Sequence, residues 1–132
     1  VYRGDRGLTY ASRLPRGSRI TAGAWWKKDY RGPPLISFDE RIARGSGVGV
    51  GDTLTLQILG REVTARIASL REIDWTSYRL NHTIVFAPGT LESAPHTFVA
   101  AAFATKEAEH SLFQSTTQRF PNVVAIYTRD VL

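Results

Sequence analysis

The amino-acid sequence predicts an α+β fold: a small mixed β-sheet or partial barrel around a hairpin at about 53–73, and a β-α-β lobe at the C-terminus. Two patterns carry this prediction. Apolar and polar residues alternate over 53–73, as in a half-buried hairpin, and apolar residues recur every three or four positions over 105–120, as in a helix. The 132 residues are enough to bury a core without a disulfide or a metal.

The first third of the chain is expected to hold two strands and a loop. Residues 7–14 place Leu8, Tyr10 and Leu14 on one side of an extended segment, which favours a half-buried strand. A second short strand is expected at 19–23. Aromatic residues, lysines, a glycine and paired prolines follow over 25–34, and this mixture predicts an irregular loop.

A short helix is expected next, between a capping signal and a glycine. Ser37 and Glu40 have the spacing of a capping box, in which each side chain bonds the other residue's backbone N–H. Phe38 and Ile42 supply the apolar stripe of this helix, and Gly45 ends it. The glycine-rich run that follows precedes a strand, which is the reverse of a dinucleotide-binding loop, and it lacks the Gly-Lys-Ser/Thr of a P-loop.

The hairpin is the strongest strand prediction. Strands at 53–58 and 62–73 flank a turn at 59–60, and the second strand turns three apolar residues inward: Val63, Ala65 and Ile67. Further strands are expected at 83–87 and 97–104.

The C-terminal part predicts strand, helix and strand in succession. Thr105 is expected to cap a helix that ends before Pro121, and a strand is expected at 123–127. A helix between two strands favours a right-handed crossover that makes those strands parallel. We therefore expect a hairpin lobe at about 20–95 and a β-α-β lobe at about 96–132, with residues 7–14 as a candidate strand to complete the second lobe.

The net charge of +5 is concentrated at the N-terminal end. Residues 1–31 carry eight basic and two acidic side chains, whereas the remaining residues carry nine basic and ten acidic ones. A solvated surface is the simplest explanation of such a segment. A basic, β-rich module that binds nucleic acid stays open as an alternative, because cations interleaved with aromatic rings can contact single strands.

The residues singled out as candidate partner or client contacts are aromatic and basic residues near predicted loops or strand ends: Trp25, Trp26, Lys27, Lys28 and Trp75. Large aromatics in such positions are more often core or lid residues than binding anchors.

Catalytic, metal and cofactor sites are not expected. His82, His96 and His110 are 14 residues apart each time, without the close spacing that metal ligands prefer. Glu72 and Asp74 lie on one side of an extended segment and would be the pair of a small hydrolase. No further residue type around them indicates a cleft, so we expect a non-enzymatic protein.

The order of these signals resembles the extracytoplasmic domain of FtsX/MacB-like ABC-transporter permeases. Within that group it is similar to the second large periplasmic loop of the YbbP-type branch. The resemblance runs from about residue 8 to 132 and includes Arg-Glu-Ile-Asp-Trp at 71–75 and Phe-Ala-Pro-Gly at 86–89. The other matching segments are 21–26, 36–40, 50–56, 119–122 and 128–132. The loop at 30–34 departs from it, because it is longer and more basic than expected.

The resemblance implies a single domain cut from a longer inner-membrane subunit, exposed to the periplasm and flanked by transmembrane helices. Such a subunit pairs with a cytoplasmic ABC ATPase, which carries the nucleotide-binding motifs, and nucleic acid is not among its partners. Related permeases export or extract hydrophobic or lipid-like clients, or act on a periplasmic protein. The matching motifs look like folding signals, so the resemblance assigns no functional residue.

Overall fold

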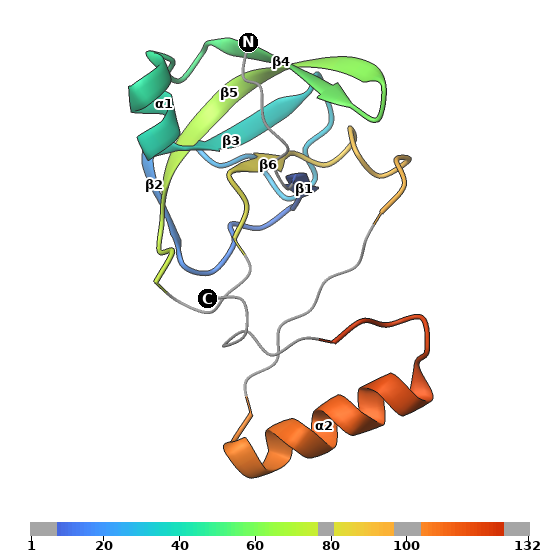
Figure 1. Ribbon diagram of the computed structural model, residues 1–132. Helices are drawn as coiled ribbons and strands as arrows, with labels where there is room; N and C mark the ends of the chain where they lie inside the picture. The colour runs from blue at the N-terminus through green and yellow to red at the C-terminus, as the bar shows by residue number, and fades with distance from the viewer. Residues whose placement is uncertain (1–7, 77–80, 97–103, 126–132) are drawn as a thin grey trace. The chain divides into compact units, whose positions relative to one another are not determined.

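The computed structural model describes residues 8–76, 81–96 and 104–125 (Figure 1). The chain divides into two compact units, residues 1–97 and 98–132. The first unit contains the strands β1 (Leu8–Tyr10), β2 (Ser18–Gly23), β3 (Leu35–Asp39), β4 (Thr53–Ile58), β5 (Arg61–Ile73) and β6 (Ile84–Phe86), and the helix α1 (Glu40–Ser46). The second unit contains the helix α2 (Lys106–Arg119).

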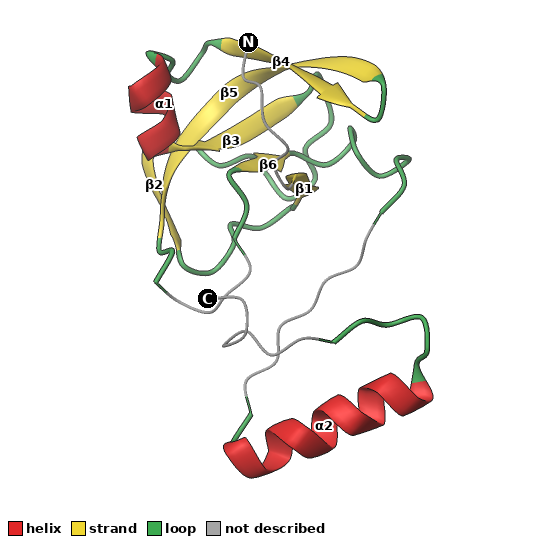
Figure 2. Cartoon of the chain, viewed as in Figure 1, coloured by secondary structure: helices red, strands yellow, loops and turns green. Residues whose placement is uncertain are grey.

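A mixed sheet organises the first unit, which confirms the predicted α+β class (Figure 2). Its strand order is β1-β6-β3-β5-β2, and β4 pairs with β5 outside that path. Strands β1 and β6 are parallel, as are β3 and β5, whereas the other pairs are antiparallel. The long strand β5 therefore joins three neighbours and holds the unit together.

The predicted hairpin is confirmed. Strands β4 and β5 pair from Thr53 opposite Arg66 to Ile58 opposite Arg61. Leu59 and Gly60 form the two-residue turn, with φ angles of 49° and 83°. Two positive φ angles give the turn a twist that matches the right-handed twist of the strands.

The predicted capping box is wrong, and the helix begins later than expected. Ser37 and Phe38 lie in β3, which pairs with β5 on one side and β6 on the other. Asp39 caps α1 instead, since its side chain accepts a hydrogen bond from the Arg41 N–H at 2.9 Å. Pairing on both edges of a central strand outweighs the local capping signal. Gly47, in the left-handed conformation, terminates the helix.

Two apolar clusters lie on opposite faces of the sheet. Successive residues of β6 and the residue after it alternate between them: Ile84 and Phe86 belong to the larger cluster, and Val85 and Ala87 to the smaller one. The larger cluster also holds residues of α1, β3, β4 and β5: Ala43, Ile36, Phe38, Leu56, Ala65 and Ile67. The sheet is therefore buried on both faces where β6 and β3 meet.

A bulge at Ala68 shifts the register of β5. Ile36 pairs with Ile67, whereas Ser37 pairs with Ser69, so Ala68 is the extra residue. Gly23 crosses directly over this bulge: an added Cβ there would lie 2.2 Å from the Ala68 carbonyl oxygen, and its φ is 72°. Only glycine fits this crossing without a shift of the backbone.

The helix predicted after residue 105 is confirmed as α2. The Thr105 hydroxyl accepts a hydrogen bond from the Ala108 N–H at 3.2 Å, and Phe120 follows the last turn. Of the strands predicted around it, residues 97–103 and 126–127 lie outside the described residues. Residues 123–125 are described and are not in a strand. In the described part of the chain, neither helix combines the length and apolarity that a membrane crossing requires.

Candidate functional site

The loop of residues 24–34, named the tryptophan loop, is attached to the segment that follows β1. The Trp25 indole N–H donates to the Ser12 carbonyl oxygen at 3.0 Å, and the Trp26 indole N–H donates to the Ala11 carbonyl oxygen at 2.8 Å. The two rings are tilted against each other, with centroids 4.0 Å apart. These contacts fix the loop beside residues 11–12, although it has no regular secondary structure.

The four consecutive residues predicted as contacts divide by exposure. Trp26 is only 7% exposed and packs with Val85 and Ala87 in the smaller apolar cluster. Trp25 is half-buried, and Lys27 and Lys28 are exposed. Trp26 therefore stabilises the fold, while the two lysines and one side of Trp25 face solvent.

Trp75 lies at the other end of the β2–β5 pair. The backbone N–H of Asp74, its neighbour, donates to the Gly17 carbonyl oxygen, just before β2 begins. The tryptophan loop starts where β2 ends, and the six residues of β2 span roughly 20 Å at about 3.3 Å per residue. The structure therefore does not bring Trp75, which is 46% exposed, to the same site as the tryptophan loop.

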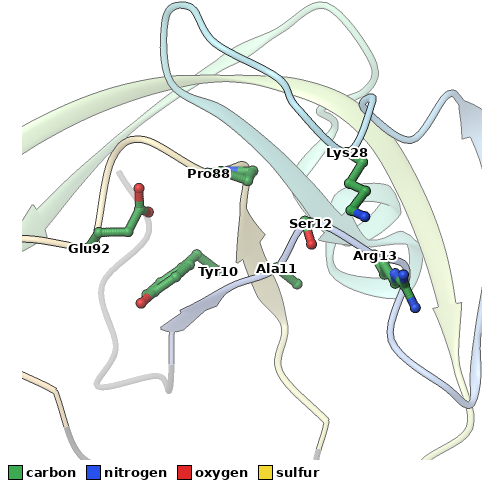
Figure 3. Close-up of a pocket in the computed structure, with 7 residues that line it drawn as sticks. All are labelled: Tyr10, Ala11, Ser12, Arg13, Lys28, Pro88 and Glu92. Carbon is green, nitrogen blue, oxygen red and sulfur yellow. The ribbon is translucent and has the colours of Figure 1, made fainter.

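A pocket of about 590 Å³, open to solvent, lies where three segments converge (Figure 3). The end of β1 with the segment after it, and the tryptophan loop, supply one side, and the turn after β6 supplies the other. Its lining residues are Tyr10, Ala11, Ser12, Arg13, Lys28, Pro88 and Glu92. The pocket thus combines an apolar surface with three charged side chains.

Two polar contacts hold the side of the pocket formed after β6. The Glu92 carboxylate accepts a hydrogen bond from the Gly89 N–H, which ties the side chain to its own turn. The Tyr10 hydroxyl lies 3.1 Å from His96 Nε2, and the two rings meet edge to face with centroids 5.4 Å apart. Tyr10 and Glu92 are therefore oriented by neighbours and not only by solvent.

A second polar feature is buried within the first unit, around Arg71. Its guanidinium donates from Nε to Ser37 Oγ at 3.0 Å, and from one terminal nitrogen to the carbonyl oxygens of His82 at 2.8 Å and Thr83 at 3.0 Å. Ser69 Oγ donates to Ser37 Oγ at 2.7 Å. Arg71 is 1% exposed, so it links β5, β3 and the segment before β6 away from solvent.

Burial shifts two ionisations in this network. Loss of solvent lowers the pKa of Arg71 to about 10, although the nearby Asp39 carboxylate acts in the opposite direction. Loss of solvent, together with the Arg71 charge, also lowers the pKa of His82. At neutral pH the network therefore contains a charged arginine and a neutral histidine.

Sequence reasoning missed Arg71 as a buried residue. The alternation over 63–67 gave the signal, because its continuation places positions 69, 71 and 73 on a buried side of the strand. In the sequence, Arg71 stands out only as part of a matching motif. The pocket was missed as well, since its residues are separated by up to 82 positions, from Tyr10 to Glu92.

The other candidate residues for chemistry are dispersed. Glu72 pairs with Arg19, and the Asp74 carboxylate accepts from the Thr76 N–H and hydroxyl. His82 contacts the Arg71 network, His96 contacts Tyr10, and His110 lies on α2. Within the described ranges, no three histidines, aspartates or glutamates come together as a metal site.

Comparison with known proteins points to one class. No family model matches the chain, and no solved structure matches it significantly. Sequence similarity relates the chain to ABC transporter permeases. One relative is the uncharacterized ABC transporter permease YbbP of Escherichia coli (strain K12), which is 31% identical over 119 residues. The match covers 88% of this chain and 14% of the permease, so the chain corresponds to a small part of that protein.

Proposed function

We propose that this chain is the extracytoplasmic domain of an ABC permease subunit of the FtsX/MacB-like type. In this proposal the subunit lies in the inner membrane, the domain projects into the periplasm, and a cytoplasmic ATPase drives its movement. The domain transmits that movement to a hydrophobic or lipid-like client or to a periplasmic protein. The observation that carries the proposal is the similarity to YbbP, which extends over 88% of the chain.

The hydrogen-bond partners of the carboxylates support a non-enzymatic role. A hydrolase that used Glu72 and Asp74 would need both carboxylates directed at a substrate. Glu72 instead pairs with Arg19 across the β2–β5 pair, and Asp74 bonds to Thr76 in the turn after β5. Such contacts are typical of a strand end that is stabilised by its own charges.

A test of this proposal measures movement of the domain with the nucleotide state. The full-length permease is reconstituted with its ATPase, and Lys27→Cys supplies a reporter on the exposed side of the tryptophan loop. We expect the labelling rate of this cysteine to differ between the nucleotide-free complex and the complex trapped with ATP. An ATPase variant that cannot bind ATP is the control and should abolish the difference. Identical rates in every nucleotide state would contradict coupling.

Two measurements on the 132-residue chain test whether it binds nucleotides itself and whether it is a nucleic-acid-binding module. Calorimetry with ATP should show no binding, and micromolar affinity would contradict the assignment of nucleotide binding to a partner subunit. A nucleic-acid-binding module would lose affinity for oligonucleotides steeply between about 50 mM and about 200 mM salt. Strong, salt-sensitive binding would favour that alternative, whereas weak binding at both concentrations would dismiss it.

A further inference from the structure

The charges around the pocket are separated by sign. Figure 3 shows Arg13 and Lys28 at one end and Glu92 at the other, with Ala11 and Pro88 between them. Within the described residues, neither Arg13 nor Lys28 forms an ion pair with a carboxylate of the chain. The pocket therefore presents two cations and one carboxylate to whatever enters it, at opposite ends of an apolar surface.

Hydrogen bonds of the tryptophan loop join the two backbone segments that carry the cations. Arg13 directly follows Ser12, whose carbonyl oxygen accepts from the Trp25 indole, and Lys28 lies three residues beyond Trp25. At the other end, the Gly89 N–H orients the Glu92 carboxylate. A carboxylate has about four acceptor positions, so this bond leaves it able to accept from a ligand. Contacts within the chain therefore position the backbone of this site and its carboxylate.

The size and lining of the pocket restrict the ligand. The pocket measures about 590 Å³ and is open to solvent, so it has room for a small molecule that stays partly exposed. The apolar surface of Tyr10, Ala11 and Pro88 suits the carbon atoms of a ligand. Opposite charges at the two ends suit a molecule that itself carries an anion and an amine.

We propose that this pocket binds a zwitterionic headgroup of the glycerophosphoethanolamine type, with its phosphate between Arg13 and Lys28 and its amine at Glu92. Arginine and lysine are the side chains that bind phosphate oxygens best. A primary amine can donate to the Glu92 carboxylate, and the ring of Tyr10 offers a further favourable contact for a cation. This inference goes beyond the proposed function, because the site lies within this chain and its test needs no ATPase.

The test titrates the 132-residue chain by calorimetry with two soluble ligands. Glycerophosphoethanolamine carries both charges, whereas glycerol 3-phosphate carries only the anion. We expect saturable binding of glycerophosphoethanolamine. Lys28→Gln and Arg13→Gln should each weaken it about three- to tenfold, because each removes one phosphate contact at a partly exposed site.

Glu92→Gln provides the discriminating variant. Glutamine can still accept the Gly89 N–H bond, so the turn is retained, but the charge that recognises the amine is lost. We expect this variant to weaken glycerophosphoethanolamine about three- to tenfold and not to weaken glycerol 3-phosphate. Lys27→Gln is the matched control for Lys28→Gln: it removes an exposed neighbouring lysine that does not line the pocket, and should change affinity less than about twofold.

Three results would overturn the proposal: absence of saturable binding of glycerophosphoethanolamine, equal weakening by Lys27→Gln and Lys28→Gln, or no effect of Glu92→Gln on the zwitterion. A second arm identifies the source of the headgroup. Phosphatidylcholine vesicles containing phosphatidylethanolamine should bind the chain more tightly than phosphatidylcholine alone if the headgroup is presented by a lipid. Binding of the soluble compound without this difference would assign the site to a free headgroup compound instead.

Discussion

Replacing the buried Arg71 by methionine should destabilise the chain far more than removing an exposed charge from the same strand. Methionine keeps an unbranched apolar stem but cannot donate hydrogen bonds. The substitution removes three contacts of 3.0 Å or less, to Ser37 Oγ and to the carbonyl oxygens of His82 and Thr83. Ser37 Oγ and the Thr83 carbonyl oxygen keep second donors, Ser69 Oγ and the Asp39 N–H, so the cost is that of the bonds themselves: at about 1 kcal/mol for each, about 3 kcal/mol. One effect acts in the opposite direction: the methionine variant no longer buries a charge. Burying that charge is unfavourable in the native chain, as the lowering of the Arg71 pKa to about 10 indicates, so its removal recovers part of the lost stability.

Urea unfolding followed by tryptophan fluorescence measures this loss. With an m value of about 1.5 kcal/mol/M, the midpoint should fall by about 2 M urea. Arg66→Met is the matched control, since Arg66 is on the same strand and exposed, and its free energy of unfolding should change by less than about 0.5 kcal/mol. Arg71→Lys, which keeps a charge and three donors, should fall between the two. Equal stability of the Arg71→Met and Arg66→Met variants would refute the role assigned to the buried network.

Three further predictions follow from the packing and the charges. Gly23→Ala should lower the free energy of unfolding by about 1–3 kcal/mol through backbone strain at φ 72°, whereas Gly45→Ala, with no atom within 4 Å of the added Cβ, should not destabilise the chain. Trp26→Phe should cost about 1–2 kcal/mol in urea unfolding, because it removes the bond to the Ala11 carbonyl oxygen and part of a buried ring. Because the folded chain lowers the pKa of His82, protonation favours unfolding. Stability should therefore fall as the pH drops below about 6.5, and the dependence should weaken in His82→Gln; an unchanged pH profile would contradict it.

The elements that sequence reasoning found are those with strong local signals. The hairpin could be predicted because the alternation of apolar and polar residues and a two-residue turn with glycine occur together in one stretch of chain. The helix α2 could be predicted because the Thr105 cap and the spacing of apolar residues after it both indicate a helix. Local patterns of this kind need no knowledge of distant residues.

The elements that sequence reasoning missed depend on contacts between distant residues. The Ser37–Glu40 capping signal is equally good locally, but pairing of β3 with two strands decides the conformation there. The alternation continued to residue 73 places Arg71 on the buried side of β5, but its partners are Ser37 and the carbonyl oxygens of His82 and Thr83, distant residues that no local pattern identifies. The pocket needs residues from three separate segments, and the tryptophan loop joins two of them through hydrogen bonds from its indoles.

The exposure of this segment in the full-length protein is the most direct test of the central claim that it is an extracytoplasmic domain of a permease. The 132 residues contain no cysteine, so Arg61→Cys, at the exposed end of the hairpin, introduces a single reactive thiol into the segment. With other cysteines of the full-length protein removed, a membrane-impermeant maleimide is added to cells whose inner membrane is intact. The account predicts labelling before that membrane is permeabilised. Labelling only after permeabilisation would place the segment in the cytoplasm and contradict the account.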